Sequence, residues 1–388
     1  MRNRNAVVAA FFLGVAFSAA GFGKNKVNYH NYHWKILKTT HFDIYFDQDQ
    51  IRIAKEAARV AEEANDKLSK LLGHTLTQRI PLILFPSHNE FEENNIAFDI
   101  VGEGTGGFTE SLKNRVVVPF EGDYSDFRHV LTHEMVHAFQ YDILFGSSKA
   151  NIFLRPFQTT PPLWFMEGMA EWASIDWDAG AEMYVRDATI SSRLLSLEEM
   201  EDEGRLPIYG GYLLYKEGQA FVHYLASEFG SEKIAELLRN FRGTRNLGQS
   251  MGALYEKEPD IISREWMNHM KKIYWPFLGR KDPPSEGATQ LTFHFKDDSI
   301  STFDPAWSPD GKEIAALAIQ EDFVRLVLLN AETGRVTRRL VKAGLSKNFE
   351  ELNLRHNRLS WSGNGKWIVF VSKAGASDQI NVIDRRGK

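Results

Sequence analysis

The sequence predicts an α+β domain followed by a smaller all-β domain that is built from repeats. Three observations support this fold class. Strand and helix patterns alternate in the first part of the chain, residues 161–279 have a mostly helical pattern, and a 54-residue repeat follows them. The chain has 388 residues, of which 43% are hydrophobic, so it is long enough for two or three domains.

Hydrophobic periodicity predicts the elements of the first domain. Phe42, Ile44 and Phe46 alternate along one face of an expected strand. A longer stretch, rich in Ala, Glu and Lys, has apolar residues at helical spacing and ends at Gly73, a good C-terminal stop. The expected strands are 36–46, 80–85 and 115–120, and the expected helices are 51–72, 125–145, 218–229 and 232–241. This order predicts one sheet packed by helices.

A change in character marks the second domain. Residues 280–288 contain two prolines and several charges, which is typical of a linker. Beyond it, Trp307 and Trp361 stand 54 positions apart, each before a Gly-containing turn and an apolar strand. A repeat of this length predicts the blades of a β-propeller.

The segment SPDGK at residues 308–312 resembles the TolB-type propeller family. Residues 289–388 hold about two blades, whereas a closed propeller needs at least about four. We therefore expect an incomplete propeller, completed either in a longer protein or elsewhere. The resemblance implies a surface that a protein partner could bind.

Composition limits the chemistry of the protein. The chain contains no cysteine, which excludes disulfides, thiolate metal sites and cysteine catalysis. Any metal must therefore be held by His, Asp or Glu. The formal net charge of −5 gives no basic excess, so we expect no nucleic-acid partner.

Residues 1–20 are typical of a cleavable signal peptide. Arg2 and Arg4 precede an apolar run, and Ser18 and Ala20 are small residues that favour cleavage after Ala20. The run is too short for a comfortable membrane span, and no later segment is long enough for one. We therefore expect a periplasmic or secreted protein without an integral span, with residues 21–279 as its first mature domain. The alternative is an uncleaved signal anchor.

The motif HExxH lies within the helix expected at 125–145. His133 and His137 are four residues apart, so both imidazoles lie on one helix face and can reach one ion. Glu134 lies on the same turn, close enough to reach a water molecule at that ion. His129, four residues before His133, is expected to be a flanking helix residue rather than a ligand.

A catalytic zinc site needs a third protein ligand. Thirty residues after His137, Glu167 and Glu171 are four apart on one helix face in an aromatic setting. One of these carboxylates can bind the metal while the other accepts a hydrogen bond from a ligating histidine. The alternative is that both are surface charges of an amphipathic helix.

HExxH followed by Glu-Gly-x-Ala-Glu resembles the gluzincins, the thermolysin-like and aminopeptidase-like metallopeptidases of clan MA, over about residues 34–277. The resemblance implies a zincin-like α+β fold and a Zn²⁺ ion on His133, His137 and Glu167. It implies that Glu171 supports a ligand histidine, more specifically His133, and that Glu134 is the general base. By the same resemblance Tyr215 stabilises the oxyanion, with Tyr212 and Tyr209 as the other candidates and simple helix packing as the alternative.

One departure affects the expected substrate. Aminopeptidases of this clan carry a Gly-x-Met-x-Asn motif before the metal helix, and residues 106–110 read GGFTE instead. Residues 106–110 or 115–119 could still form an edge strand that pairs with an extended peptide. The sequence therefore predicts a zinc-dependent peptidase that acts on a peptide or protein. The alternatives are a propeller-based scaffold protein with a vestigial metal domain and a zinc hydrolase of another substrate class.

Overall fold

The computed structural model describes residues 30–97, 101, 104–146, 159–202, 210–279, 282, 284–293, 300–320, 323–344, 348–352, 359–374 and 377–388. The expected signal peptide, residues 1–20, and Tyr209 lie outside these described residues. The chain divides into two compact units, one of residues 1–70 and 74–158, the other of residues 71–73 and 159–388.

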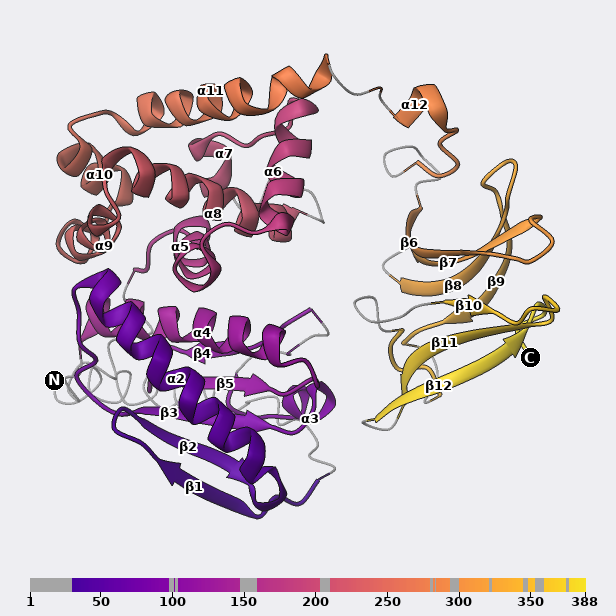
Figure 1. The fold of residues 1–388 in the computed structure, drawn as a ribbon, viewed down its shortest axis with the longest axis horizontal. Helices are drawn as coiled ribbons and strands as arrows, with labels where there is room; N and C mark the ends of the chain where they lie inside the picture. Colours follow the sequence, from indigo (N-terminus) through magenta and orange to yellow (C-terminus); the bar gives the residue numbers. More distant parts are fainter. Residues whose placement is uncertain are drawn as a thin grey trace, which may run out of the picture. The chain divides into compact units, whose positions relative to one another are not determined.

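The first unit is built on a five-stranded sheet (Figure 1). Its strands are β1 (Trp34–Lys38), β2 (Phe42–Asp47), β3 (Ile80–Phe85), β4 (Phe108–Glu110) and β5 (Arg115–Pro119), in the order β1-β2-β3-β5-β4. The three central strands β2, β3 and β5 are parallel, and the outer strands β1 and β4 are antiparallel to their neighbours. Of the two segments proposed to form an edge, β4 is therefore the edge strand, and β5 lies inside the sheet.

The single strand expected at 36–46 is a hairpin of β1 and β2. Backbone hydrogen bonding from Thr39 N to Phe42 O (3.0 Å) closes the turn, and Thr39 Oγ1 accepts from Phe42 N at 3.1 Å. The turn is stabilised by a threonine hydroxyl and contains neither Gly nor Pro, the residues that usually mark a turn in a sequence. The sequence pattern therefore did not predict it. The predicted alternation in β2 is confirmed, because Phe42, Ile44 and Phe46 are all buried.

The helices of the first unit are α2 (Ile51–Leu72), α3 (His88–Glu92) and α4 (Tyr124–Phe145), with the 3₁₀ helix η1 (Gln48–Gln50) before α2. The bounds of α2 are those expected from its periodicity. Asp123 caps α4 by accepting hydrogen bonds from Ser125 N (2.6 Å) and Asp126 N (3.1 Å). This helix packs on β4 and β5, and its second half is almost entirely buried. The HExxH motif thus lies on a core helix.

The second unit contains the mostly helical segment that the sequence predicts. Its helices are α5 (Leu163–Ile175), α6 (Ala179–Ile190), α7 (Leu197–Glu201), α8 (Gly210–Phe229), α9 (Glu232–Thr244), α10 (Leu247–Tyr255), α11 (Pro259–Leu278) and the short α12 (Pro284–Gly287). The largest contact among them is between α5 and α8. No helix in the described part of the chain is long and apolar enough to cross a bilayer.

Two antiparallel sheets follow α12. The first has the order β6 (Ser301–Trp307), β7 (Glu313–Gln320), β8 (Phe323–Asn330), β9 (Val336–Lys342), and the second β10 (Ser360–Trp361), β11 (Trp367–Ala374), β12 (Ser377–Asp384). Strands β11 and β12 begin 54 residues after β7 and β8, at Trp367 against Glu313 and at Ser377 against Phe323. The repeat is therefore structural. The two described sheets do not close into a ring, and the propeller stays a prediction.

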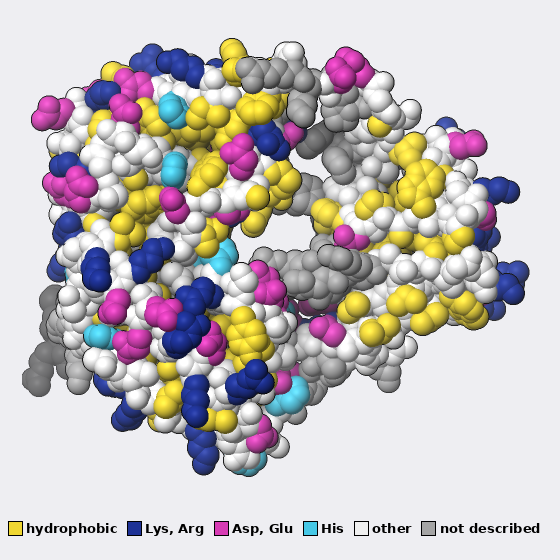
Figure 2. Space-filling view, viewed as in Figure 1, with side chains coloured by type: hydrophobic (Ala, Val, Ile, Leu, Met, Phe, Trp, Pro, Cys, Tyr) yellow, Lys and Arg dark blue, Asp and Glu magenta, His cyan; other side chains and the backbone are white. Residues whose placement is uncertain are grey.

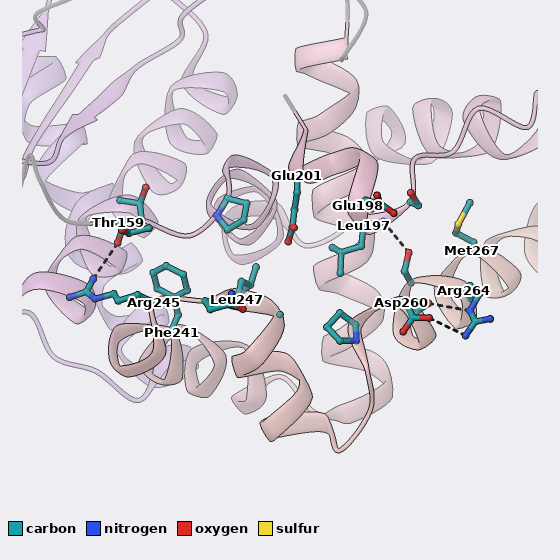
Figure 3. Close-up of a pocket in the computed structure, with 17 residues that line it drawn as sticks. Thr159, Leu197, Glu198, Glu201, Phe241, Arg245, Leu247, Asp260, Arg264 and Met267 are labelled. Carbon is teal, nitrogen blue, oxygen red and sulfur yellow. Dashed lines mark hydrogen bonds and ion pairs between the residues drawn. The ribbon is translucent and has the colours of Figure 1, made fainter. Parts of the chain in front are cut away.

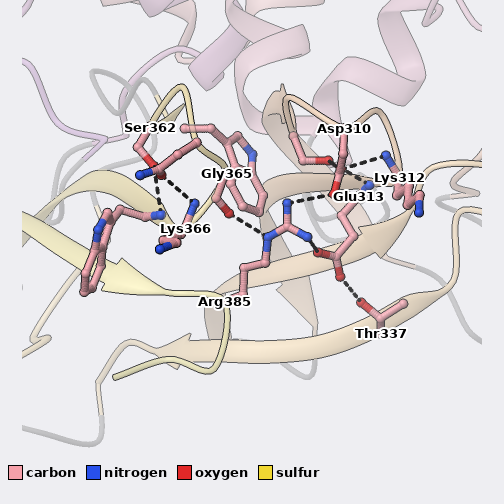
Figure 4. Close-up of polar contacts among 12 residues, drawn as sticks. Asp310, Lys312, Glu313, Thr337, Ser362, Gly365, Lys366 and Arg385 are labelled. Carbon is pink, nitrogen blue, oxygen red and sulfur yellow. Dashed lines mark hydrogen bonds and ion pairs between the residues drawn. The ribbon is translucent and has the colours of Figure 1, made fainter.

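The turns before β7 and β11 repeat the same hydrogen bonds (Figure 4). Ser308 Oγ donates to Asp310 Oδ1 (2.7 Å) and accepts from Glu313 N (3.0 Å). At the equivalent positions, Ser362 Oγ donates to Asn364 Oδ1 at 2.8 Å and accepts from the next strand at 3.0 Å. Arg385 joins the two turns, since it donates to Gly365 O and pairs with Asp310 at 3.1 Å.

Charged side chains of both signs cover the surface of the first unit. On the face shown in Figure 2, Lys and Arg side chains are interspersed with Asp and Glu rather than gathered in one patch. Several of these charges form ion pairs, such as Arg59 with Glu63 at 2.7 Å and Arg128 with Glu63 at 2.9 Å. Exposed pairs of this kind contribute little to stability, typically under about 1 kcal/mol each.

Candidate metal centre

His133 and His137 meet on the buried side of α4. Their Nε2 atoms lie 3.2 Å apart, and both side chains are buried. Two nitrogens that each bind a tetrahedral zinc ion at about 2.0–2.1 Å lie about 3.3 Å from one another. The separation in the structure therefore fits two imidazoles that share one ion.

Gln140 determines which nitrogen of His137 can bind a metal. The Nδ1 atom of His137 lies 2.7 Å from Oε1 of Gln140, a fully buried residue one turn further along α4. An amide oxygen only accepts, so Nδ1 must carry the proton and donate. The Nε2 atom then keeps its lone pair for a metal, which is the arrangement that outer hydrogen bonds impose on ligating histidines.

Thr109 on the edge strand β4 contacts the expected base. Its hydroxyl oxygen lies 2.8 Å from Glu134 Oε2 and 2.7 Å from the backbone oxygen of Glu134. As a donor at this distance, the hydroxyl restricts the rotamer of the carboxylate. Glu134 is itself buried, so its carboxylate is held at a defined place on α4.

Gly107 allows β4 to approach α4 closely. A Cβ atom added at Gly107 would lie 3.0 Å from Val130 and 3.1 Å from Cγ of Glu134. These contacts are tighter than ordinary van der Waals packing, so a larger residue at this position would push the strand away from the helix. The GGFTE segment therefore brings the backbone of β4 and the Thr109 hydroxyl to Glu134.

Glu167 and Glu171 lie one turn apart on α5, Glu167 half-buried and Glu171 buried. Two overlapping sets of side chains could hold a metal ion. The ligand atoms of His133, His137 and Glu167 lie within 4.8 Å of one another, as do those of His129, His133 and Glu171. The first is the set expected from the sequence. The second includes His129, which the sequence analysis treats as a flanking residue.

The Glu171 carboxylate has a strong partner that the sequence analysis missed. Lys216 on α8 is buried, and its Nζ donates to Glu171 Oε2 at 2.6 Å and to Asp178 Oδ2 at 3.2 Å. Burial acts to lower the pKa of Lys216, but the Glu171 carboxylate outweighs burial and the pKa is raised overall. Burial likewise acts to raise the pKa of Asp178, and backbone donation from Ala181 together with Lys216 lowers it overall. Lys216 and Asp178 are therefore both charged at neutral pH.

Tyr215 precedes Lys216 on α8 and is half-buried. Three residues later, Gly218 packs directly on Gly168 of α5, which follows Glu167 in the chain. This crossing brings the α8 segment of Tyr215 and the α5 segment of Glu167 together in one tightly packed helix pair. Tyr212, the second tyrosine candidate, is about half exposed and packs edge-on against Tyr184.

Comparison with protein families decides the classification. Residues 60–272, which are 213 of the 388 residues, match the model of the Peptidase MA superfamily. The chain belongs to the Peptidase MA superfamily. The matched region includes α4 with its two histidines, α5 with its two glutamates and α8 with Tyr215 and Lys216. A comparison with curated proteins finds no match to this chain.

Membership of the Peptidase MA superfamily gives the chain a peptidase-like domain with mixed helix and sheet content. It also agrees with the His and Glu groups that could hold a metal, because the superfamily is typically metal-dependent. The donor set of two imidazole nitrogens and one carboxylate oxygen is one that zinc accepts in catalytic sites.

A separate cavity of about 690 Å³ lies among the helices of the second unit (Figure 3). Side chains from α7, α9, α10 and α11 line it, among them Glu198, Glu201, Phe241, Arg245 and Arg264. None of the candidate ligand residues lines this cavity. The candidate metal ligands therefore lie outside this cavity.

Proposed function

We propose that this protein is a zinc-dependent peptidase in which His133, His137 and Glu167 hold the metal. The observation that carries the proposal is the pair of Nε2 atoms 3.2 Å apart, with His137 Nδ1 committed to Gln140. Grouping of the three ligand atoms within 4.8 Å and membership of the Peptidase MA superfamily support it. A bound zinc ion would supply Lewis acidity, which polarises the scissile carbonyl and makes a water molecule more acidic.

Glu134 is the proposed general base. Its carboxylate accepts a proton from the attacking water and passes that proton to the nitrogen of the leaving amine. The hydroxyl of Thr109, 2.8 Å from Oε2, orients the carboxylate for this transfer. Because Thr109 lies on β4 and Glu134 on α4, the close packing at Gly107 holds base and edge strand together.

The edge strand β4 is the proposed guide for an extended substrate. It pairs on one side with β5, and as an edge strand it presents backbone donors and acceptors on the other. A peptide added there by strand pairing would have its backbone fixed independently of its side chains. This mode suits unfolded or extended polypeptides of varied sequence.

Tyr215 is the proposed donor to the oxyanion. A neutral phenol that donates a hydrogen bond to developing negative charge stabilises the transition state more than the ground state. Its place on α8, one turn before the glycine that packs on α5, supports this assignment. Tyr212 is a weaker candidate, because about half of its surface is exposed.

We also propose that the protein acts in the cell envelope or outside the cell. The support is the pattern of residues 1–20, with Arg2 and Arg4 before an apolar run and Ala20 at the expected cleavage point. Determining the N-terminal residue of the mature protein after expression in a bacterial host tests this proposal. A start at Gly21 would support it, and retention of residues 1–20 in a membrane fraction would favour the uncleaved anchor.

The decisive test of the proposed function is hydrolysis of a fluorescently labelled, chemically unfolded protein. Three samples are compared: the zinc-loaded protein, its E134Q variant with zinc bound, and the protein after removal of zinc by a chelator. We expect cleavage by the first sample alone, and recovery of the third when zinc is added back. Full activity of zinc-loaded E134Q would contradict the proposed role of Glu134.

A further inference from the structure

The C-terminal end of α11 carries a group of exposed apolar side chains. They are Ile273, Trp275, Phe277 and Leu278, which are 42%, 47%, 39% and 56% exposed. No other six consecutive residues in the described part of the chain hold as many exposed large hydrophobic side chains. All four belong to the second unit, and we call them the apolar tip of α11. Single exposed apolar residues are common on protein surfaces, whereas a contiguous group indicates a surface that something covers.

The rest of α11 has the ordinary pattern of a surface helix. A buried stripe recurs at every fourth position, formed by Ile262, Trp266, Met270 and Tyr274. At residues 273–278 the apolar character extends around the helix, because positions 273 and 275 lie about 200° apart about its axis. A helix that is apolar on every side is normally buried. The apolar tip therefore has more hydrophobic surface than the packing of α11 requires.

The apolar tip is held in place from its buried side. Tyr274 is 3% exposed, and its hydroxyl donates to Glu182 Oε2 on α6 at 2.8 Å. Helix α11 packs on α6, and its C-terminal end lies beside that helix (Figure 1). Because Tyr274 fixes this turn, Ile273 and Trp275 cannot rotate into the core unless Tyr274 leaves it. Their exposure is thus built into the helix packing.

Basic residues flank the apolar tip in the sequence. Lys271 and Lys272 precede it, and Arg280 and Lys281 follow it. Residues 266–281 contain no Asp or Glu, although the whole chain has a formal net charge of −5. The apolar tip therefore lies in a locally cationic segment of an acidic protein.

Contacts in the structure preserve this local positive charge. The Nζ atom of Lys271 lies 5.3 Å from the ring centroid of Trp275, so this cation stays beside the apolar tip. Glu182, which binds Tyr274, also pairs with Arg186 at 3.8 Å. Its negative charge is therefore engaged by Arg186, and the lysines of α11 are left for an external anion.

An apolar group with a basic border fits an anionic lipid surface better than it fits a protein. Lysine is depleted in protein–protein interfaces, whereas Lys and Arg beside Trp, Phe and Leu are typical of helices that lie in the membrane interface. Tryptophan favours the level of the lipid head groups. Lysine can keep its ammonium at the phosphates while its methylene chain lies along apolar surface.

We propose that the apolar tip of α11 binds the surface of an anionic phospholipid membrane. Trp275, Phe277 and Leu278 enter the head-group region, and the flanking Lys and Arg side chains contact lipid phosphates. This inference goes beyond the proposed peptidase activity and does not use the metal centre. It holds the helical part of the second unit at a membrane, which agrees with the proposed place of action in the cell envelope.

The absence of cysteine allows a test at one position of the full chain. The L278C variant is labelled with NBD, a fluorophore whose emission shifts to the blue in an apolar environment. We expect a blue shift with vesicles of phosphatidylglycerol and phosphatidylcholine in equal parts, and a much smaller shift with phosphatidylcholine alone. Because the readout is local to position 278, lipid binding by residues 1–20 does not imitate it. The matched control is labelled Q249C, at an exposed position of α10, whose emission should not change.

Substitutions in the labelled L278C protein separate the apolar and the electrostatic contributions. We expect W275S to raise the lipid concentration at half-maximal shift at least about tenfold, because apolar area is lost. K271Q/K272Q should raise it about fivefold for each lysine, and an increase in salt from about 50 mM to about 500 mM should act in the same direction. I261S removes an exposed apolar side chain at the other end of α11 and should leave the value unchanged.

Three results would overturn the proposal. They are no lipid-dependent shift at position 278, equal shifts at positions 278 and 249, and a label at position 278 that emits as if buried without vesicles. In the third case protein covers the apolar tip. Sedimentation velocity then assigns the cover to a second copy if a native dimer is lost in W275S/L278S, and to the chain itself if the native protein is a monomer.

Folding and activity are controlled separately. Circular dichroism checks the folding of each variant, and W275Q replaces W275S if the latter does not fold. Neither zinc content nor hydrolysis enters the fluorescence readout. A protein that cuts no substrate would therefore defeat the proposed peptidase activity and leave the membrane test readable.

Discussion

Gly168 on α5 and Gly218 on α8 pack backbone against backbone. A Cβ atom on Gly168 would lie 2.8 Å from Cα of Gly218, and one on Gly218 would lie 3.3 Å from Cα of Gly168 and overlap the carbonyl oxygen of Trp164. Backbone atoms cannot swing aside as a long side chain can. These glycines therefore fix the distance between the helix that carries both glutamates and the helix that carries Tyr215 and Lys216.

We predict that G218A destabilises the helical part of the second unit. The alanine gains helix propensity of about 0.8–1 kcal/mol, but the overlap with α5 costs about 1–3 kcal/mol and separates the helices. Thermal unfolding followed by circular dichroism at 222 nm measures the change. The matched control is G243A on α9, where an added Cβ meets nothing within 4 Å and the melting temperature should stay level or rise. A G218A protein as stable as G243A would show that the crossing tolerates a methyl group.

Loss of the Thr109 hydroxyl should slow turnover without loss of metal. In T109V the Glu134 carboxylate loses a hydrogen bond of 2.8 Å that orients it. Hydrogen bonds to charged groups contribute about 1.5–3 kcal/mol, so we expect kcat to fall about 10–100-fold while zinc affinity and KM change little. T109S keeps the hydroxyl and should recover most of the rate. A T109V enzyme with native kcat would mean that Glu134 is oriented without Thr109.

Gln140 should matter for metal binding although it is not a ligand. In Q140L, Nδ1 of His137 loses its acceptor at 2.7 Å, and the tautomer that leaves Nε2 free is no longer favoured. We expect zinc affinity to fall about 10–100-fold in chelator competition. Q140E keeps an acceptor at the same place and should retain zinc. If Q140L and Q140E bound zinc equally well, the orienting role of Gln140 would be wrong.

Glu217 should make stability depend on pH. It is fully buried, and burial raises its pKa to about 8 from an ordinary 4.5, although Oε2 accepts from Leu195 N at 2.9 Å. Between pH 4.5 and pH 8 the folded protein binds more protons at this site than the unfolded chain does. Stability contributed by the neutral carboxyl is therefore present at low pH and lost as pH rises through this window.

The variant E217Q isolates this contribution. Gln stays neutral at every pH and keeps an oxygen that can accept from Leu195 N. We expect metal-free E217Q and native protein to have similar melting temperatures near pH 5, with E217Q the more stable above pH 8. Parallel melting-temperature profiles for the two proteins between pH 5 and pH 9 would show that Glu217 does not titrate in this range.

Much of the secondary structure could be predicted from hydrophobic pattern. The helix 51–72 and the strand 80–85 have the bounds expected for them, because each has a strong period and a clear end. Helix α8 begins at Gly210, eight residues before its expected start at 218. The sequence analysis missed these first two turns because they begin with two glycines, which disfavour helix in isolation. Packing of Gly218 on α5 requires a glycine inside this helix, which pattern alone cannot show.

The site could be predicted only where its residues stand in local motifs. His133, Glu134 and His137 come from one helix turn, and the Glu167/Glu171 pair from another, but their roles stay predictions. Gln140 had a local signal, since it lies three residues after His137 on the same helix.

Thr109 and Lys216 had no such signal. Thr109 reaches Glu134 across 25 positions, and Lys216 reaches Glu171 across 45. Both contacts depend on strand order and helix crossing, which the sequence does not reveal.

Adjacent residues of α8 carry opposite electrostatic requirements. Lys216 is a buried cation that needs the carboxylates of Glu171 and Asp178, and Glu217 is a buried acid whose burial favours the neutral form. Successive residues on a helix point about 100° apart, so each side chain enters a different environment. A shift of α8 by one residue would place the acid among carboxylates and the ammonium where Leu195 N donates. The opposite requirements of these two neighbours therefore favour one rotational orientation of α8 about its axis.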